Sequence, residues 1–265
     1  VTGTVDITDS TLDVTLGYTP TDGDSYIIIN NDGVDAITGT FDGLAEGDQL
    51  VVSGSVFAIS YVGGDGNDVE LTYVPTNLDD VYVDDDWAGL SLGVDPDGVG
   101  PATAIGVDAF AVIQDGVDAV NADGTVHVYA GTYAEETFIY NKGLTLQGES
   151  ADASDIMIDA SSFGSGISAD AGTSDLTFAN FSVFDATSIG MIITQGGGNV
   201  TFDNVVVRRA ATFGIYVRES GTVSLTDTIS SDNGNIGLLI DETDQVIDTN
   251  GKYNFNSNGG INLID

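Results

Sequence analysis

Carboxylates are abundant in this protein, but side chains that could serve as a catalytic base together with them are few. Among its 265 residues, 42 are acidic, five are basic, one is a histidine and none is a cysteine. The basic residues are Lys142, Arg208, Arg209, Arg218 and Lys252. A calcium-dependent lyase would need clustered carboxylates for the metal and an arginine or lysine as the base, and a glycoside hydrolase would need two or three carboxylates in one groove. The lack of cysteine excludes disulfides and thiol chemistry.

Two of the arginines have carboxylates at regular distances along the chain. Asp185 lies 24 residues before Arg209 in the sequence, and Asp232 lies 23 residues after it. Asp241 likewise lies 23 residues after Arg218. This spacing equals the repeat described below, so we interpret the carboxylates as ion-pair partners on neighbouring turns of a repeating fold, each contributing little. A lyase centre built from Arg209, Asp185 and Asp232 is the alternative, because ion-pair networks and catalytic sites look alike.

The single histidine gives no support to a catalytic triad. His127 lies between Val126 and Val128 in an alternating, strand-like run. We therefore expect its side chain to face solvent, and no Ser-His-Asp set can be assembled without it.

Carboxylates suited to calcium lie in two acidic segments, "DDDW" at 84–87 and "DPDG" at 95–98. Calcium takes six to eight oxygen ligands from such loops, so we predict a calcium site at Asp84, Asp86, Asp95 and Asp97. A solvated acidic linker is the equal alternative.

A third acidic segment, "GGDGNDVEL" at 63–71, resembles the calcium nonapeptide G-G-x-G-x-D-x-U-x, in which U is a large apolar residue. Here Glu70 occupies the U position and Leu71 falls one place late. A shift of one place moves a side chain to the other face of a strand. We therefore interpret this segment as a tight turn between two alternating strands.

The elements that must position these residues repeat along the second half of the chain. Four similar segments begin at Leu176, Val200, Val223 and Val246, at a nearly constant interval. Two columns recur within them: the glycines Gly190, Gly214, Gly237 and Gly260, and the polar residues Asn180, Asn204, Asp227 and Asn250. A regular period of this length with several short strands in each repeat is typical of a solenoid.

Each column predicts a structural role. We expect the glycines to supply a positive φ, and the Asn/Asp column to form bends and an amide ladder along the axis. Apolar residues two apart after each glycine should fill the interior, with Met191, Ile215, Leu238 and Ile261 forming one stack. Ile192, Tyr216 and Leu239 lie between inward residues and should form an outward column. A loop of the same chain or a partner would cover that column.

Before the repeats, Phe110, Ile113, Val117 and Val120 recur with helical spacing. A short helix followed by "GTVHVYAGTY" and "KGLTLQGE" resembles the start of right-handed parallel β-helix proteins of the pectate-lyase-like superfamily. The resemblance implies that the helix caps the solenoid, and that many relatives cleave polysaccharides. The segment over 1–73 resembles β-rich parts of bacterial autotransporters and adhesins, and in it Val5, Ile7, Leu12, Val14 and Leu16 alternate like strands.

These observations predict an all-β protein: a β-rich N-terminal domain over 1–74, an acidic junction over 75–104 and a right-handed parallel β-helix with a short capping helix over 105–265. The net charge of −37 repels nucleic acid and anionic lipid, and no membrane span is visible. We expect a non-catalytic structural or adhesive module, an acidic rod of a secreted or cell-surface bacterial protein. A polysaccharide lyase is the alternative.

Expected partners are copies of the chain or flanking modules of the same protein, joined end to end, and surface glycans. The chain opens and closes within strand-like patterns. We therefore expect either an excerpt of a longer protein or a subunit that stacks into filaments.

Overall fold

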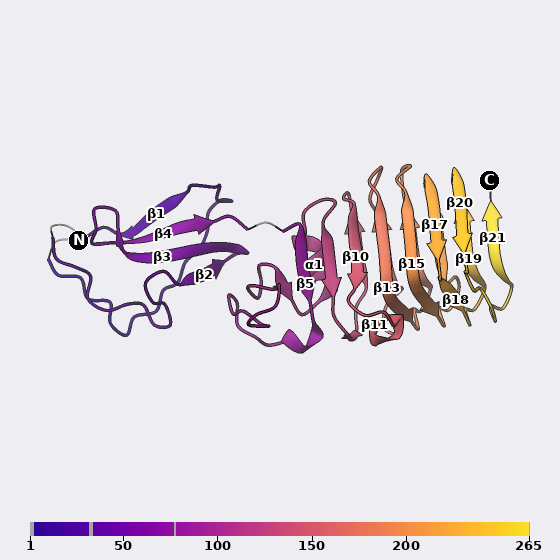
Figure 1. The fold of residues 1–265 in the computed structure, drawn as a ribbon, viewed down its shortest axis with the longest axis horizontal. Helices are drawn as coiled ribbons and strands as arrows, with labels where there is room; N and C mark the ends of the chain where they lie inside the picture. The colour runs from indigo at the N-terminus through magenta and orange to yellow at the C-terminus, as the bar shows by residue number, and fades with distance from the viewer. Residues whose placement is uncertain (1–2, 32–33, 77, 265) are drawn as a thin grey trace. The chain divides into compact units, whose positions relative to one another are not determined.

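The computed structural model describes residues 3–31, 34–76 and 78–264. The described residues are all-β with a single α-helix. They divide into two compact units, each considered by itself: an N-terminal unit of residues 1–77 with 90–107, and a solenoid unit of residues 78–89 with 108–265 (Figure 1). The junction predicted over 75–104 therefore contributes residues to both units.

The N-terminal unit contains a four-stranded antiparallel sheet in the order β1-β4-β3-β2. The strands are β1 (Ser25–Ile29), β2 (Gln49–Val52), β3 (Ser55–Gly63) and β4 (Asp68–Val74). β3 and β4 form a hairpin that closes at the Gly63–Asp68 pair, which confirms that "GGDGND" is a turn. Phe57, Ile59, Val69 and Leu71 alternate along the hairpin and are buried in the core of this unit.

The alternating residues near the start of this unit do not form regular strands. Val5 and Ile7 are buried against the same core, but the backbone around them makes only isolated bridges, such as the one between Asp6 and Thr38. The prediction of strands from the alternation of Val5 to Leu16 is therefore wrong, although these apolar residues pack against the core.

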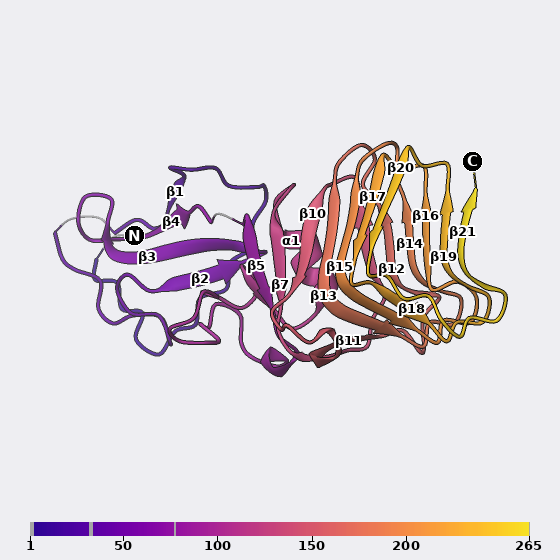
Figure 2. The same ribbon diagram turned by 45° about the vertical axis from the view of Figure 1, so that its right-hand side comes forward.

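The solenoid unit consists of about eight parallel turns, which stack one after another from β5 to β21 (Figures 1 and 2). Its described residues contain an eleven-stranded and a six-stranded sheet. The first sheet contains β5 (Asp80–Val83), β6 (Ala109–Phe110), β7 (Thr125–Val128), β8 (Gly131–Tyr133), β10 (Leu144–Gly148), β11 (Ile156–Asp159), β13 (Leu176–Phe184), β15 (Val200–Arg208), β17 (Thr222–Thr226), β18 (Ile229–Ser231) and β20 (Gln245–Thr249). The second contains β9 (Thr137–Tyr140), β12 (Ser165–Asp170), β14 (Ile189–Thr194), β16 (Ile215–Arg218), β19 (Ile236–Asp241) and β21 (Gly259–Ile264).

Strand register confirms the repeat alignment. The four segment starts pair directly, Leu176 with Val200, Val200 with Val223 and Val223 with Val246. The predicted interior stack also pairs in register. Its members Met191, Ile215 and Leu238 are buried, but Ile261 is 47% exposed. Ile261 differs because β21 has only β19 as a neighbour among the described strands, so one side of its side chain is not covered.

The glycine column has a different cause from the predicted one. None of Gly190, Gly214, Gly237 and Gly260 has a positive φ. A Cβ atom would instead lie 2.6 Å from the Gly214 carbonyl oxygen if it were added to Gly190, and 2.7 Å from the Gly237 carbonyl oxygen if it were added to Gly214. The Val207 side chain at Gly190 and the Ser230 hydroxyl at Gly214 would lie closer still. Glycine is needed at these two positions because the backbone of the next turn and nearby side chains leave no room for a Cβ atom.

The Asn/Asp column does adopt the left-handed backbone conformation, as predicted. The φ angles of Asn180, Asn204, Asp227 and Asn250 are 59°, 50°, 47° and 62°. A second left-handed column, not predicted from the sequence, contains Asp185, Arg209, Asp232 and Phe255, with φ between 58° and 64°. Each of these four repeats therefore bends at two fixed positions, where Asn and Asp tolerate the left-handed conformation better than other residues that have side chains.

The predicted helix is present as α1 (Ile113–Ala119), and Ile113, Val117 and Val120 are buried in the solenoid core. Glu135, from a later loop, accepts hydrogen bonds of 2.9 Å from the backbone N–H groups of Ile113 and Gln114. This carboxylate satisfies two of the N–H groups that a helix start leaves without partners. Phe110, predicted to belong to the helix, lies in β6 instead.

Candidate functional site

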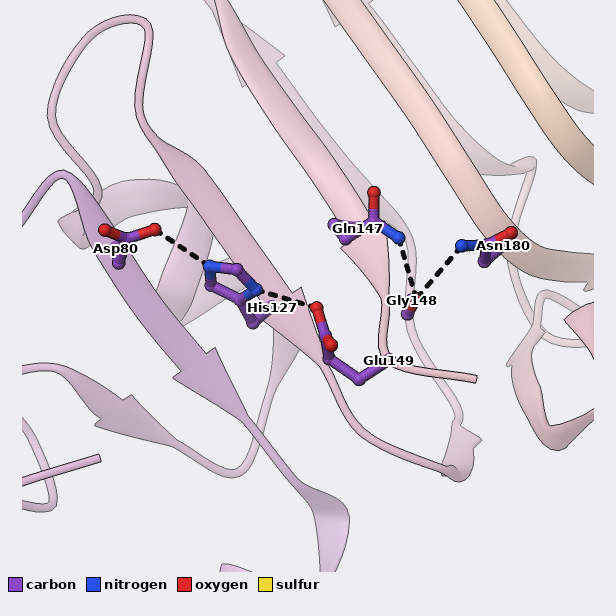
Figure 3. A network of polar contacts seen from close by, with 6 residues as sticks. All are labelled: Asp80, His127, Gln147, Gly148, Glu149 and Asn180. Carbon is purple, nitrogen blue, oxygen red and sulfur yellow. Dashed lines mark hydrogen bonds and ion pairs between the residues drawn. The ribbon is translucent and has the colours of Figure 1, made fainter. Parts of the chain in front are cut away.

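A polar cluster on the first turns of the solenoid surrounds the only histidine (Figure 3). The Nε2 atom of His127 lies 2.8 Å from Oδ1 of Asp80, and its Nδ1 atom lies 2.7 Å from Oε1 of Glu149. The three side chains come from β5, β7 and the residue after β10, which are successive neighbours in one sheet. We refer to these three residues as the histidine clamp.

Strand register creates the histidine clamp. Val126 and Val128 point into the core, so His127 between them points outward, as predicted. Tyr82 pairs with His127, and their rings stack with centroids 5.0 Å apart and planes 17° apart. The imidazole side chain is only 23% exposed because the tyrosine ring and two carboxylates surround it. The sequence analysis did not identify these partners: Glu149 is 22 residues and Asp80 is 47 residues from His127 along the chain.

The clamp favours the charged imidazolium. Partial burial lowers the pKa of His127, but hydrogen bonds to Glu149 and Asp80 and the charges of both carboxylates outweigh burial and raise it above the usual value. With both ring nitrogens bonded to carboxylates, neither has a free lone pair to accept a substrate proton. The arrangement is suited to holding three turns together rather than to proton transfer.

The same face continues into the predicted amide ladder. The side-chain amides of Gln147 and Asn180 both donate to the carbonyl oxygen of Gly148 (Figure 3). Asn180 Oδ1 in turn accepts a 3.0 Å hydrogen bond from Asn204 Nδ2 on the next turn. Only this first step of the predicted ladder is present, since Asp227 and Asn250 make no side-chain hydrogen bond in the described structure.

Arg209, the candidate base, is held by one carboxylate. Its Nε and one terminal nitrogen donate to the two oxygens of Asp185 at 2.6 and 2.8 Å, and its guanidinium carbon lies 4.8 Å from the centre of the Phe184 ring. The hydrogen bond to Arg209 holds the pKa of Asp185 below its usual value. Asp232, the other predicted partner, contributes to the surrounding negative potential but forms no ion pair with Arg209 in the described structure.

The predicted pair between Arg218 and Asp241 is present but long, at 3.8 Å, and Glu219 lies closer at 2.8 Å. Lys142 donates from Nζ to the Val120 carbonyl oxygen at 2.7 Å. Sequence spacing therefore found one cross-turn partner of each arginine, but it wrongly added Asp232 to Arg209. It missed Glu242, which lies 3.7 Å from Arg218, as well as the same-turn neighbour and the backbone acceptor.

The four aspartates predicted to bind calcium lie in different units. Asp84 and Asp86 lie at the short 3₁₀ helix η1 (Asp85–Trp87) in the solenoid unit, whereas Asp95 and Asp97 lie in the N-terminal unit. Asp84 Oδ1 accepts from the Asp86 N–H, and Asp95 Oδ1 accepts from the N–H groups of Asp97 and Gly98. Burial raises the pKa of Asp84. No group of three or more acidic or histidine side chains in the described ranges is arranged to hold a metal ion, and calcium stays a prediction.

The outward column is confirmed in register, and Ile192, Tyr216 and Leu239 pair across β14, β16 and β19. Leu239 is 8% exposed and the other two are half-buried. Phe213 lies against Tyr216, with ring centroids 6.1 Å apart. A nearby loop residue of the same turn thus covers part of this column.

Comparison with known proteins found no matching family model, no matching curated protein and no matching solved structure. The fold assignment therefore rests on the parallel turns themselves. Among the described helices, none has the length and apolar character needed to span a membrane.

Proposed function

We propose that this protein is a non-catalytic structural and adhesive module, an acidic β-solenoid rod that belongs to a secreted or surface-exposed bacterial protein. The observation that supports it best is the use of its few reactive side chains. His127 is bonded on both ring nitrogens, and Arg209 is bonded by two oxygens of one carboxylate. These two groups, which could have carried acid–base chemistry, are engaged in holding adjacent turns together.

Extension of the rod is the second part of the proposal. In the last described turn, β20 and β21 each pair on one side only, and Ile261, Leu263 and Ile264 are between 46% and 57% exposed. Unpaired strand edges with apolar side chains accept further strands. A flanking module of the same protein or a second copy would supply them, and surface glycans are the adhesive partners we propose.

Particle size tests this extension. If copies stack, sedimentation and electron microscopy at rising concentration should show longer particles with a regular axial repeat, and Ile261→Lys should stop their growth. A strict monomer at high concentration would leave only a flanking module as the partner.

The alternative proposal is a carbohydrate-active enzyme, a polysaccharide lyase of the pectate-lyase-like kind. It is favoured by the carboxylates around Arg209, since the negative charges of Asp185, Asp232 and Asp159 all raise the pKa of its guanidinium. Incubation with pectate, alginate and neutral glycans, with and without calcium, separates the two proposals. We expect no unsaturated product. A product that forms in the unmodified protein and disappears in Arg209→Ala would replace the structural proposal with the enzymatic one.

A further inference from the structure

Arg208 differs from the basic residues whose side chains are bonded to other groups of the protein. Arg209 and Arg218 pair with carboxylates, and Lys142 donates to a backbone carbonyl. The guanidinium of Arg208 forms no hydrogen bond or ion pair with any residue of the described ranges, and its Nε atom is buried without a partner. Lys252, the fifth basic residue, is exposed to solvent, so Arg208 is the one partly buried cation among the described residues whose side chain has no hydrogen-bond partner.

The position of Arg208 is set by the sheet. It ends β15 and pairs with Phe184 on the preceding turn and Ser231 on the next. Its backbone carbonyl accepts a 3.1 Å hydrogen bond from the Asp185 N–H, which fixes the base of the side chain. The neighbouring Asp185 carboxylate bonds to Arg209 through both of its oxygens and makes no ion pair with Arg208 in the described structure.

Arg208 lines a surface depression of about 620 Å³, which we call the Arg208 depression. This volume lies within the range of roughly 300–1,000 Å³ typical of small-molecule sites. Phe184, Val206 and Ile229 give it an apolar lining, and residues 151–154 contribute to its edge. Asp152, on that edge, uses Oδ1 to accept hydrogen bonds from the backbone and hydroxyl of Ser154 and makes no ion pair with Arg208 in the part of the chain described.

The depression combines three apolar side chains, the unpaired guanidinium of Arg208 and the polar residues Asp152, Ser154 and Asn204, and the unpaired guanidinium favours an anionic ligand group. Carboxylates match the planar fork of arginine and form two charge-assisted hydrogen bonds with it. An apolar group attached to the carboxylate would cover Val206 and Ile229. Ligands with several negative charges would be repelled by the rest of the protein.

We propose that the Arg208 depression binds a monocarboxylate with an apolar body, its carboxylate on the guanidinium and its body on Phe184, Val206 and Ile229. This inference does not depend on the proposed structural role.

Calorimetric titration of the full chain with benzoate tests the proposal, with benzamide as the neutral ligand of the same shape. Measurement at about 0.15 M salt limits long-range repulsion to a screening length of about 8 Å. We expect saturable binding of benzoate and none of benzamide. Arg208→Gln should weaken benzoate binding roughly ten- to hundred-fold, the usual effect of losing hydrogen bonds to a charged group.

Lys252→Gln is the matched control, because it removes the same charge from an exposed side chain outside the depression. It should leave benzoate affinity unchanged. Arg208→Lys keeps the charge but lacks the planar fork, so it should also bind more weakly, and circular dichroism shows whether each variant is folded. Nitrogen-15 spectra of the unmodified protein should show the Nε–H signal of Arg208 shifting with benzoate. Equal affinity for benzoate and benzamide, or equal losses in Arg208→Gln and Lys252→Gln, would overturn the proposal.

Discussion

The two units of this protein differ in how the residues in contact are spaced along the sequence. In the solenoid, the same position of each turn meets its equivalent one repeat away, so the pairs Leu176–Val200 and Val200–Val223 follow one rule. In the N-terminal unit no such rule exists. Phe41 there donates its backbone N–H to the Tyr61 hydroxyl at 2.9 Å, and that hydroxyl donates to the Leu44 carbonyl, through contacts that belong to no repeat.

In the solenoid, neighbouring turns therefore carry similar residues at equivalent positions, whereas the N-terminal unit has no such equivalent positions. A side chain in the middle of the solenoid is enclosed by near-copies of itself on both sides, and stability arises largely from interfaces between neighbouring turns. A substitution there should affect several turns. A substitution in the N-terminal unit should affect a single, irregular core. The following predictions test that contrast.

The largest effect is expected for Ile215→Asp. Ile215 is fully buried between Met191 and Leu238, so an aspartate there would place an unpaired charge between two turns. We expect the solenoid to lose more than about 4 kcal/mol of stability, the range of severe core disruptions. Urea unfolding followed by circular dichroism measures this loss.

The matched control for Ile215→Asp is Ile261→Asp, in the same column but 47% exposed. It should cost far less, because the new carboxylate can reach water. Equal losses at the two positions would show that enclosure by both neighbouring turns is not the source of stability.

Gly214→Ala should have the next largest effect. Its methyl group would meet the Ser230 hydroxyl, the Asn233 side-chain nitrogen at 2.5 Å and the Gly237 carbonyl oxygen at 2.7 Å. We expect a loss of about 1–3 kcal/mol, typical of overpacking. Gly164→Ala is the control, because open space surrounds the added atom and its φ is not positive. A solenoid that tolerates both substitutions equally would contradict close approach as the reason for the glycine column.

The histidine clamp predicts a smaller effect that depends on pH. The pKa of His127 is raised in the folded protein above its ordinary value. Its stabilising effect is therefore fully present below the unfolded pKa and is lost as pH rises through the higher folded pKa. At pH values above the folded pKa, we expect the free energy of unfolding of the solenoid to fall by on the order of 1 kcal/mol, as for a partly exposed ion pair. Unfolding curves from about pH 6 to about pH 9 span this window, because free histidine titrates near its lower end.

His127→Gln should remove this pH dependence. The N-terminal unit contains no histidine, so its unfolding should not change over the same interval. A pH response that persists in His127→Gln would assign the effect to other groups.

Calcium should give the smallest and least specific effect. We expect millimolar calcium to raise the melting temperature by relieving repulsion among 42 carboxylates and by binding the predicted aspartates. Asp95→Asn combined with Asp97→Asn should reduce the calcium-specific part. An equal response to magnesium would indicate charge screening alone, because magnesium gives up its water ligands reluctantly.

The pattern of residues was enough to predict the solenoid, its register and most of its interior stack. A constant period places like side chains next to one another, and alternation fixes which residues face inward. The pattern also identified the Asn/Asp bends and the turn at 63–68, whose residue types favour left-handed or tight backbone geometry. These features depend on local conformation or on one repeated spacing.

Features that join residues without a regular spacing could not be predicted in this way. The pairing of β5 with β7 brings Asp80 to His127, and the loop at 151–154 forms the edge of the Arg208 depression. The same holds for the glycine column, whose residue type suggested a positive φ but whose cause is the approach of the next backbone. A spacing rule predicts which side chains stack. It does not predict which distant segment comes to lie over them, because that depends on the packing of the whole turn.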